Sequence, residues 1–335
     1  MDNQFQINVL KEAAKRTLPG QRLADLLVEL LDISVASAYN RMNGTTNLTA
    51  EELVTVAKAF QISLDQQIHQ FEDKVSFRFP PMFGRQPLIQ QFLLQLYQDL
   101  SRLSQIPDVH IRYVTNEIPL FYYFHFPVLG AFKLFLWGRT IWMDPVVSDT
   151  VFSSADWGGL KQEEMSQLME RLLQQFTAVP SNELWHTHFL DNTLNQITYY
   201  YGQGLIESKE TAQELIQCVS DLVDLFDTFL REGKKSLVGR RTKGLSGSLQ
   251  VHHNDTTHTN NTILVDAGSL SHVYFTFDNP NFMYSNDPKF MAYTREWIGK
   301  LEDVSPVVST YGQAARTRLI KLLNMRVHEA MKQLD

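Results

Sequence analysis

The spacing of apolar residues changes near residue 109, and this change divides the chain into two parts of different architecture. Before it, apolar residues recur every three or four positions, as in Leu23, Leu27 and Leu30, which is typical of helices with one buried face. After it, short runs of β-branched and aromatic residues alternate with longer helical segments. We therefore expect an all-α domain followed by a larger mixed α/β domain.

Short helices with clear start and stop signals are predicted in the first part. Ser34 and Thr49 can each accept a hydrogen bond from a free N–H of the helical turn that follows. Gly44 suits the left-handed backbone that ends a helix. Five helices are predicted between residues 7 and 71, and they are expected to start near Asn8, Leu23, Val35, Ala50 and Leu64.

Two prolines and a glycine close together separate the two parts of the chain. They predict a linker at 73–85 between a first domain, 1–72, and a second domain, 86–335. A long helix is expected at 85–105. Its apolar stripe fits a core face, which is the commoner use of such a stripe, or a dimer seam; the stripe consists of Leu88, Phe92, Leu96, Leu100 and Leu103.

In the second domain, alternating and aromatic-rich runs predict strands at 110–115, 120–126, 250–253, 262–265 and 273–277. The segment between the strands at 250–253 and 262–265 is rich in Asn, Asp and Thr, and we expect it to form a hairpin-like loop. Helical spacing predicts helices at 127–142, 162–176, 191–201, 208–231, 290–300 and 313–333.

Four segments resemble the helix-turn-helix domain of the lambda-repressor and Cro class, in the BetR-type variant of bacterial regulators: Leu27–Ser34, Ser37–Gly44, Leu48–Leu53 and Ala57–Asp65. The resemblance covers about a fifth of the chain. It implies a DNA-binding transcription regulator. The remaining residues resemble uncharacterised carboxy-terminal regions that accompany this domain, and that resemblance brings no known ligand.

The resemblance places a recognition helix at 35–42. Arg41 on its outer face would pair with guanine, and Asn40 with adenine, in a major groove. The expected DNA-binding residues are Ser34, Ser37, Asn40, Arg41, Thr45, Thr46 and Asn47. Asp32 stands where the family favours Gly. Residues 1–67 hold six basic and eight acidic side chains, so a single domain is expected to bind DNA weakly unless a homodimer doubles the contacts.

Other clusters of polar residues leave alternatives open. The basic run at 231–243 fits a solvated loop or a phosphate contact. His186 and His188, and the group His252, His253 and His258, could hold a metal, but they lack a metalloprotease motif and no metal is expected.

The single cysteine, Cys218, excludes an internal disulfide and fits a reducing compartment.

Motifs for nucleotide binding or nucleophilic catalysis are absent, so no enzyme activity and no cofactor are expected. The most apolar stretch, 118–142, is still too polar to span a membrane. Aromatic side chains could line a cavity for a small-molecule effector or could fill a core, which is the commoner outcome; those expected at such a cavity are Tyr122, Tyr123, Phe124 and Trp137.

Together these features predict a cytoplasmic, homodimeric transcription regulator that binds double-stranded DNA, with a second domain for sensing or dimerisation. The alternative is an adaptor that uses the helix-turn-helix fold for protein contacts. A basic surface around Arg41 favours DNA binding, whereas an acidic recognition face favours the adaptor.

Overall fold

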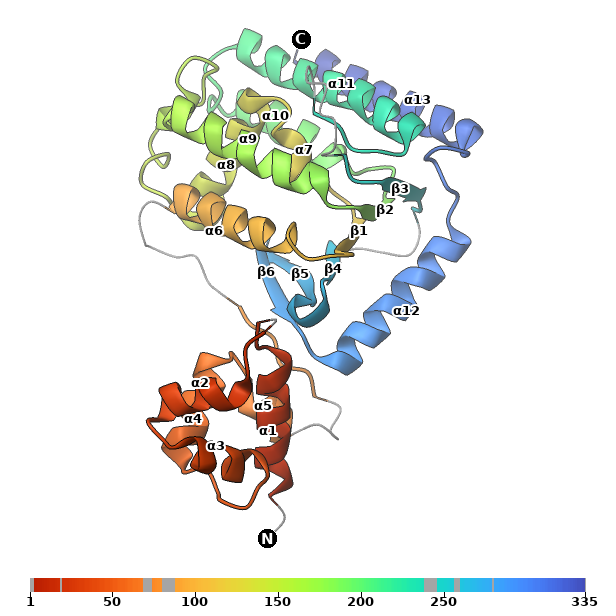
Figure 1. Ribbon diagram of the computed structural model, residues 1–335. Coiled ribbons are helices and arrows are strands. Elements are labelled where there is room, and N and C mark those ends of the chain that lie inside the picture. Colours follow the sequence, from red (N-terminus) through yellow and green to blue (C-terminus); the bar gives the residue numbers. More distant parts are fainter. Residues whose placement is uncertain are drawn as a thin grey trace. The chain divides into compact units, whose positions relative to one another are not determined.

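The chain forms two compact units, residues 1–77 and 78–335. The computed structural model describes residues 3–18, 20–68, 74–79, 88–237, 246–255, 260–278 and 280–334. Most of the predicted linker, residues 73 and 80–85, lies outside the described residues. Each unit has its own hydrophobic core, and each is coloured by sequence in Figure 1.

The first unit consists of the five predicted helices, and the first of them begins four residues earlier than expected. The helices are α1 (Gln4–Lys15), α2 (Leu23–Leu31), α3 (Val35–Met42), α4 (Ala50–Ala59) and α5 (Leu64–Ile68). Their inner faces form a small core around Leu10, Leu27, Ala38 and Val56, all buried. The short helices are stable in this arrangement because burial of one face compensates for their length.

The predicted start and stop signals of these helices are confirmed. The Ser34 hydroxyl accepts a hydrogen bond from the Ser37 N–H at 3.2 Å. Thr49 accepts from the Glu52 N–H at 3.1 Å, and the Glu52 carboxylate accepts from the Thr49 N–H at 2.9 Å, which completes a capping box. Gly44 has a φ of 73°.

The second unit is built on a six-stranded mixed sheet with the strand order β3-β2-β1-β4-β5-β6. Strands β1, β2 and β3 are parallel, and the other neighbouring pairs are antiparallel. The strands are β1 (His110–Thr115), β2 (Ser181–Trp185), β3 (Leu249–His253), β4 (Thr262–Asp266), β5 (His272–Asp278) and β6 (Asn281–Ser285).

Helices cover both faces of this sheet, most of them on one side (Figure 1). Trp185 and Val251 pack into the large helical core, whereas Leu184 and Leu264 pack against Ile298 of α12 on the opposite face. The helices are α6 (Leu88–Leu103), α7 (Leu120–Tyr123), α8 (Pro127–Trp137), α9 (Gln162–Ala178), α10 (Asp191–Gly202), α11 (Lys209–Glu232), α12 (Pro288–Val304) and α13 (Gln313–Lys332), with short helical turns η1 (Gly138–Trp142), η2 (Trp157–Gly159) and η3 (Gly268–Leu270).

The strand predicted at 120–126 is wrong, because this segment forms helix α7 and a following turn. Successive residues of a strand point to opposite faces of the sheet. Here the consecutive residues Tyr122 and Tyr123 are both buried in one helical core. Tertiary packing thus overrides the β-propensity of these aromatic residues.

The hairpin-like loop predicted between the strands at 250–253 and 262–265 is also wrong. Strand β3 pairs with β2 and strand β4 pairs with β1, so two strands separate β3 from β4. Residues 256–259 of this connection lie outside the described residues. Strands β2 and β6 were not expected from the sequence.

The apolar stripe of α6 belongs to the core. Leu88 and Leu100 are buried, Phe92 and Leu96 pack against the same core, and Leu103 packs against a smaller buried cluster that contains Val109. The stripe is therefore not free to act as a dimer seam. Within the described residues, no helix combines the length and the apolar composition that a membrane span requires.

Candidate nucleic-acid interface

Helices α2 and α3 of the first unit are joined by a turn of three residues, 32–34. Asp32 adopts the left-handed conformation, with φ and ψ both 51°. The Ile33 N–H donates to the Val28 carbonyl at 3.3 Å, and Ser34 then caps α3. The turn therefore redirects the chain within three residues and holds α3 in a defined orientation.

Helix α3 has one buried and one exposed face. Ala38 is fully buried, and Met42, one turn later, packs against the same core. On the other face, Val35 is 52% exposed and Tyr39 is 44% exposed. Asn40 is exposed as the sequence predicts.

Val35 and Tyr39 were not among the expected interface residues. Val35 lies three positions before Ala38 and Tyr39 three positions before Met42, so helical spacing places both beside the buried row, and only the exposure seen in the structure identifies them. Ser37, which was expected on the outer face, is half-buried, and its hydroxyl accepts a hydrogen bond from the Ser34 hydroxyl at 3.0 Å.

Arg41 does not lie free on the outer face, in contrast to the sequence-based expectation. Its Nη2 donates to Glu52 Oε1 at 2.8 Å and its Nε donates to Glu52 Oε2 at 3.2 Å. The two side chains are only 14% and 18% exposed. The hydrogen bond from Arg41 lowers the pKa of Glu52, against the effect of burial, which raises it. Arg41 therefore connects α3 to α4.

The loop after α3 is held by a buried glutamine that the sequence analysis missed. Gln6 of α1 donates through Nε2 to the carbonyls of Arg41 and Thr46, at 2.7 and 2.9 Å. Its Oε1 accepts from the Leu48 N–H at 2.7 Å. The side chains of Thr45, Thr46 and Asn47 are exposed on this loop, next to the carboxyl end of α3.

Most basic side chains of this unit are already paired with acids. Arg22 contacts Asp25 at 2.8 Å, and Lys15 and Arg16 both contact Glu12, at 3.2 and 3.4 Å. Of the basic residues described between 3 and 68, Lys11 and Lys58 have no ion pair in the structure. The surface of α3 is thus polar and apolar but carries little free positive charge.

The aromatic residues expected to line an effector cavity belong to the core instead. Tyr122, Tyr123, Phe124 and Trp137 are all buried. The Tyr122 hydroxyl donates to Glu183 Oε1 at 2.7 Å, and its ring meets Phe226 edge-on at 5.1 Å. These rings therefore pack against one another and against their neighbours as part of the core.

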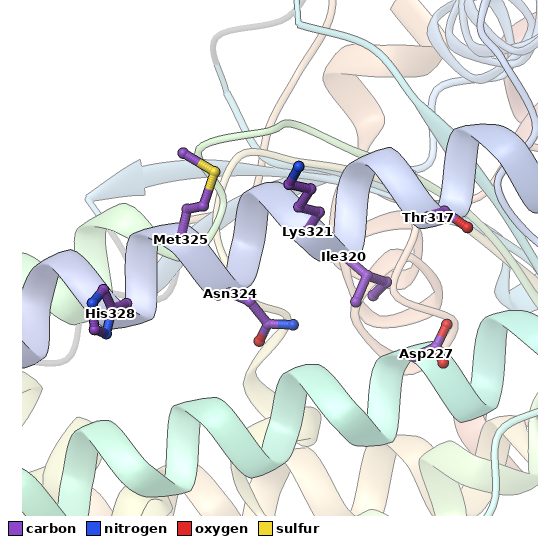
Figure 2. A pocket seen from close by; sticks show the side chains of 7 residues that line it. All are labelled: Asp227, Thr317, Ile320, Lys321, Asn324, Met325 and His328. Atoms are coloured by element: carbon purple, nitrogen blue, oxygen red, sulfur yellow. The ribbon is translucent and has the colours of Figure 1, made fainter.

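An open groove of about 620 Å³ lies elsewhere, along the surface of α13 beside Asp227 of α11. Figure 2 shows Ile320 and Asn324 of α13 pointing toward α11, whereas Lys321 and Met325 lie on the other side of α13. The groove contains none of the expected aromatic residues; it is lined by Asp227, Thr317, Ile320, Lys321, Asn324, Met325 and His328.

The histidines considered as metal ligands make polar contacts with neighbouring residues. His186 Nε2 lies 3.1 Å from the Asp255 carbonyl, His188 Nδ1 lies 2.6 Å from Asp191 Oδ2, and His253 Nε2 lies 3.1 Å from Asp255 Oδ1. Within the described part of the chain, which omits His258, no group of three or more such side chains could hold a metal ion.

The basic run at 231–243 is described only up to residue 237. Arg231 forms an ion pair with Asp227 at 2.9 Å. Lys235 is buried, with its ammonium 4.0 Å from the centre of the Phe176 ring, and burial lowers its pKa to about 8. The described part of this run thus combines a paired arginine, the exposed Lys234 and a buried lysine, whereas Arg240, Arg241 and Lys243 lie outside the described residues.

Comparison of the chain with protein-family models, with curated proteins and with solved structures finds no match.

Proposed function

We propose that the protein is a transcription regulator that binds double-stranded DNA by inserting helix α3 into the major groove. The observation that carries this proposal is the exposed face of α3, with Asn40 at its centre, opposite a face buried around Ala38. The three-residue turn after α2 and the buried Gln6 hold this face and the following loop in place. Preorganised side chains of this kind suit base recognition because little entropy is lost on binding.

The dimensions and chemistry of this region fit the proposed role. A helix with its side chains is about 10–12 Å wide, close to the width of the major groove. The Asn40 amide can donate to N7 and accept from N6 of one adenine. The exposed hydroxyls and amide of Thr45, Thr46 and Asn47 can contact phosphates, which position the protein without reading sequence.

We assign dimerisation rather than effector sensing to the second unit. Its expected effector residues, such as Tyr122 and Tyr123, are packed in the core. A homodimer would present two copies of α3 to half-sites one helical turn apart and would compensate for the small free positive charge of each copy. The proposed site of action is the cytoplasm.

Two observations favour the alternative, a protein-binding adaptor. The Arg41–Glu52 pair removes the basic side chain that favoured DNA, and the exposed Val35 and Tyr39 could also enter an apolar groove of a partner protein. The two functions differ in whether the intact protein retains duplex DNA.

Capture of genomic fragments by the intact protein at low salt tests the proposal. Specific fragments should be enriched, and Asn40→Ala should weaken their binding about tenfold or more while nonspecific binding persists. Asn324→Ala, at an exposed asparagine of α13 in the second unit, is the matched control and should change nothing. If no duplex is retained, the DNA-binding function is rejected in favour of the adaptor.

A further inference from the structure

The exposed face of α3 consists of two adjacent rows of side chains. Val35 and Tyr39 form one row, and Ala36 and Asn40 form the next, each pair separated by one helical turn. Neither Val35 nor Tyr39 is part of the core of the first unit. Three of the four side chains on this face are therefore apolar or aromatic and are open to a ligand.

No side chain on this face can recognise guanine or cytosine in the usual way. Guanine presents two acceptors, which Arg or Lys recognises, but Arg41 is held by two hydrogen bonds to Glu52. Cytosine presents an amino donor, which Asp or Glu recognises, and α3 contains no acidic residue. Ser34 and Ser37 hydrogen-bond to each other at the start of the helix.

Adenine and thymine, in contrast, match what is exposed. Asn40 carries the donor and acceptor that adenine requires, and thymine is the DNA base whose major-groove edge carries a methyl group. Val35 and Tyr39 offer exposed apolar surface beside Asn40.

We propose that α3 recognises A·T base pairs, with Val35 and Tyr39 contacting thymine methyl groups and Asn40 contacting an adenine. This inference rests on the proposed DNA-binding function. It names the base chemistry of the site and identifies Val35 and Tyr39 as specificity-determining residues. The methyl contact contributes by removing apolar surface from water, so its loss should weaken binding about fourfold for each methyl group.

Selection of duplexes from a random library by the intact protein, followed by replacement of single thymines with deoxyuridine, tests this inference. Deoxyuridine lacks only the methyl group, so base pairing is kept. We expect selected sites rich in A·T pairs and an approximately fourfold loss of affinity at one or two thymines. In Val35→Ala or Tyr39→Ala, the same replacement at the contacted thymine should have little further effect, because the partner of the methyl group has been removed.

Val54→Ala provides the matched control, since Val54 of α4 is 42% exposed in the same unit but lies outside α3. This variant should respond to deoxyuridine as the unmodified protein does. Selected sites rich in G·C pairs, or affinities that do not change with deoxyuridine, would overturn the thymine inference and leave the DNA-binding function intact. Failure to retain any duplex would overturn both, and Val35 and Tyr39 would then be assigned to a protein partner.

Discussion

Asp32 occupies a backbone position that favours glycine. Its φ of 51° costs a residue with a Cβ atom about 1–2 kcal/mol, and its charge lies at the negative end of the α2 dipole. We expect Asp32→Gly to stabilise the first unit by about 1 kcal/mol, after allowance for the greater freedom of glycine in the unfolded chain. Denaturation followed by circular dichroism measures this change.

Glu29→Gly is the control for this substitution, because residue 29 lies inside α2 with ordinary helical geometry. A glycine there should destabilise the unit by about 1 kcal/mol. Equal effects of the two substitutions would show that the left-handed turn at Asp32 carries no strain.

Lys133 of α8 is a cation buried in the core of the second unit. Its Nζ donates to Gln196 Oε1 at 2.7 Å and lies 5.2 and 5.3 Å from the ring centres of Tyr123 and Trp137. Burial lowers its pKa to about 8, and the nearby Glu117 offsets only part of this effect. The lysine of the unfolded chain keeps its proton to higher pH, near 10.5.

This difference predicts how stability changes with pH. Between the folded and unfolded pKa values the unfolded chain binds more protons, so the free energy of unfolding should rise as pH increases above about 8. Lys133→Met should remove about 1.5 kcal/mol of the rise between about pH 8 and 9.5 and should stabilise the protein at pH 7. Lys235, whose pKa is lowered to about 8 as well, still contributes to the rise of the free energy of unfolding with pH in this variant.

Urea denaturation at several pH values below about 10, where tyrosines of the unfolded chain begin to ionise, measures the effect. Lys300→Met is the matched control, because Lys300 is exposed on α12. If Lys133→Met does not change how the free energy of unfolding varies with pH, the amine of Lys133 in the unmodified protein keeps its proton throughout this range.

The Arg41–Glu52 pair fixes α3 against α4. We expect a double-mutant cycle with Arg41→Ala and Glu52→Gln to give a coupling free energy of about 1–2 kcal/mol, since both hydrogen bonds are charge-assisted and partly buried. Glutamine at position 52 can still accept from the Thr49 N–H, so the capping box is kept. Urea unfolding of the four proteins gives the coupling energy.

The exposed Arg22–Asp25 pair provides the comparison and should give a coupling of at most about 0.5 kcal/mol. DNA titration separates the two roles considered for Arg41. If Arg41 orients α3, Arg41→Ala and Glu52→Gln should weaken binding to a similar degree without changing base preference. Relaxed preference at a guanine in Arg41→Ala alone would restore Arg41 as a base-reading residue.

Some elements could be predicted from the sequence because their signals are local. The caps at Ser34 and Thr49 and the apolar spacing of α2 are contained within a few residues, and the structure confirms them. Strand β2 could not be predicted in this way, since its buried residues include Ser181 and Glu183, which are polar. Their burial is compensated by hydrogen bonds to each other and from Tyr122, which lies far away in the sequence.

In the candidate interface, too, some features follow from local sequence signals and others depend on long-range contacts. Exposure of Asn40 follows from helical periodicity alone, whereas exposure of Val35 and Tyr39, each three positions before a core residue, does not. The position of Arg41 depends on Glu52, eleven residues later on another helix. The role of Gln6 depends on a loop about forty residues away. Such long-range contacts are set by tertiary packing, which no local pattern specifies.

The small number of basic side chains without an ion pair limits how steeply the DNA affinity of the protein falls as the salt concentration rises. The chain has a net charge of −7, and Lys11 and Lys58 are the basic residues described between 3 and 68 that lack an ion pair. A dimer with about four such lysines should give a slope of log affinity against log salt no steeper than about −4. Titrations over a range of salt concentrations measure this slope, and a value near −8 would require phosphate contacts from other parts of the chain.

The two units of the molecule can be followed separately during unfolding. All five tryptophans, at positions 137, 142, 157, 185 and 297, belong to the second unit. Tryptophan fluorescence therefore reports on that unit alone, whereas far-ultraviolet circular dichroism reports on helices of both. The first unit is much smaller and buries a smaller fraction of its surface, so it should be the less stable of the two.

We therefore expect urea to produce an early change in circular dichroism, without a change in fluorescence, before both signals change together. Asp32→Gly should move the early transition to higher urea and leave the fluorescence transition in place. Leu93→Ala truncates a fully buried side chain of α6 and should destabilise the second unit by about 2–5 kcal/mol. It should move the fluorescence transition to lower urea and leave the early transition in place. If each substitution shifted both transitions equally, the two units would unfold as one cooperative structure, and their separate cores would not be independent sources of stability.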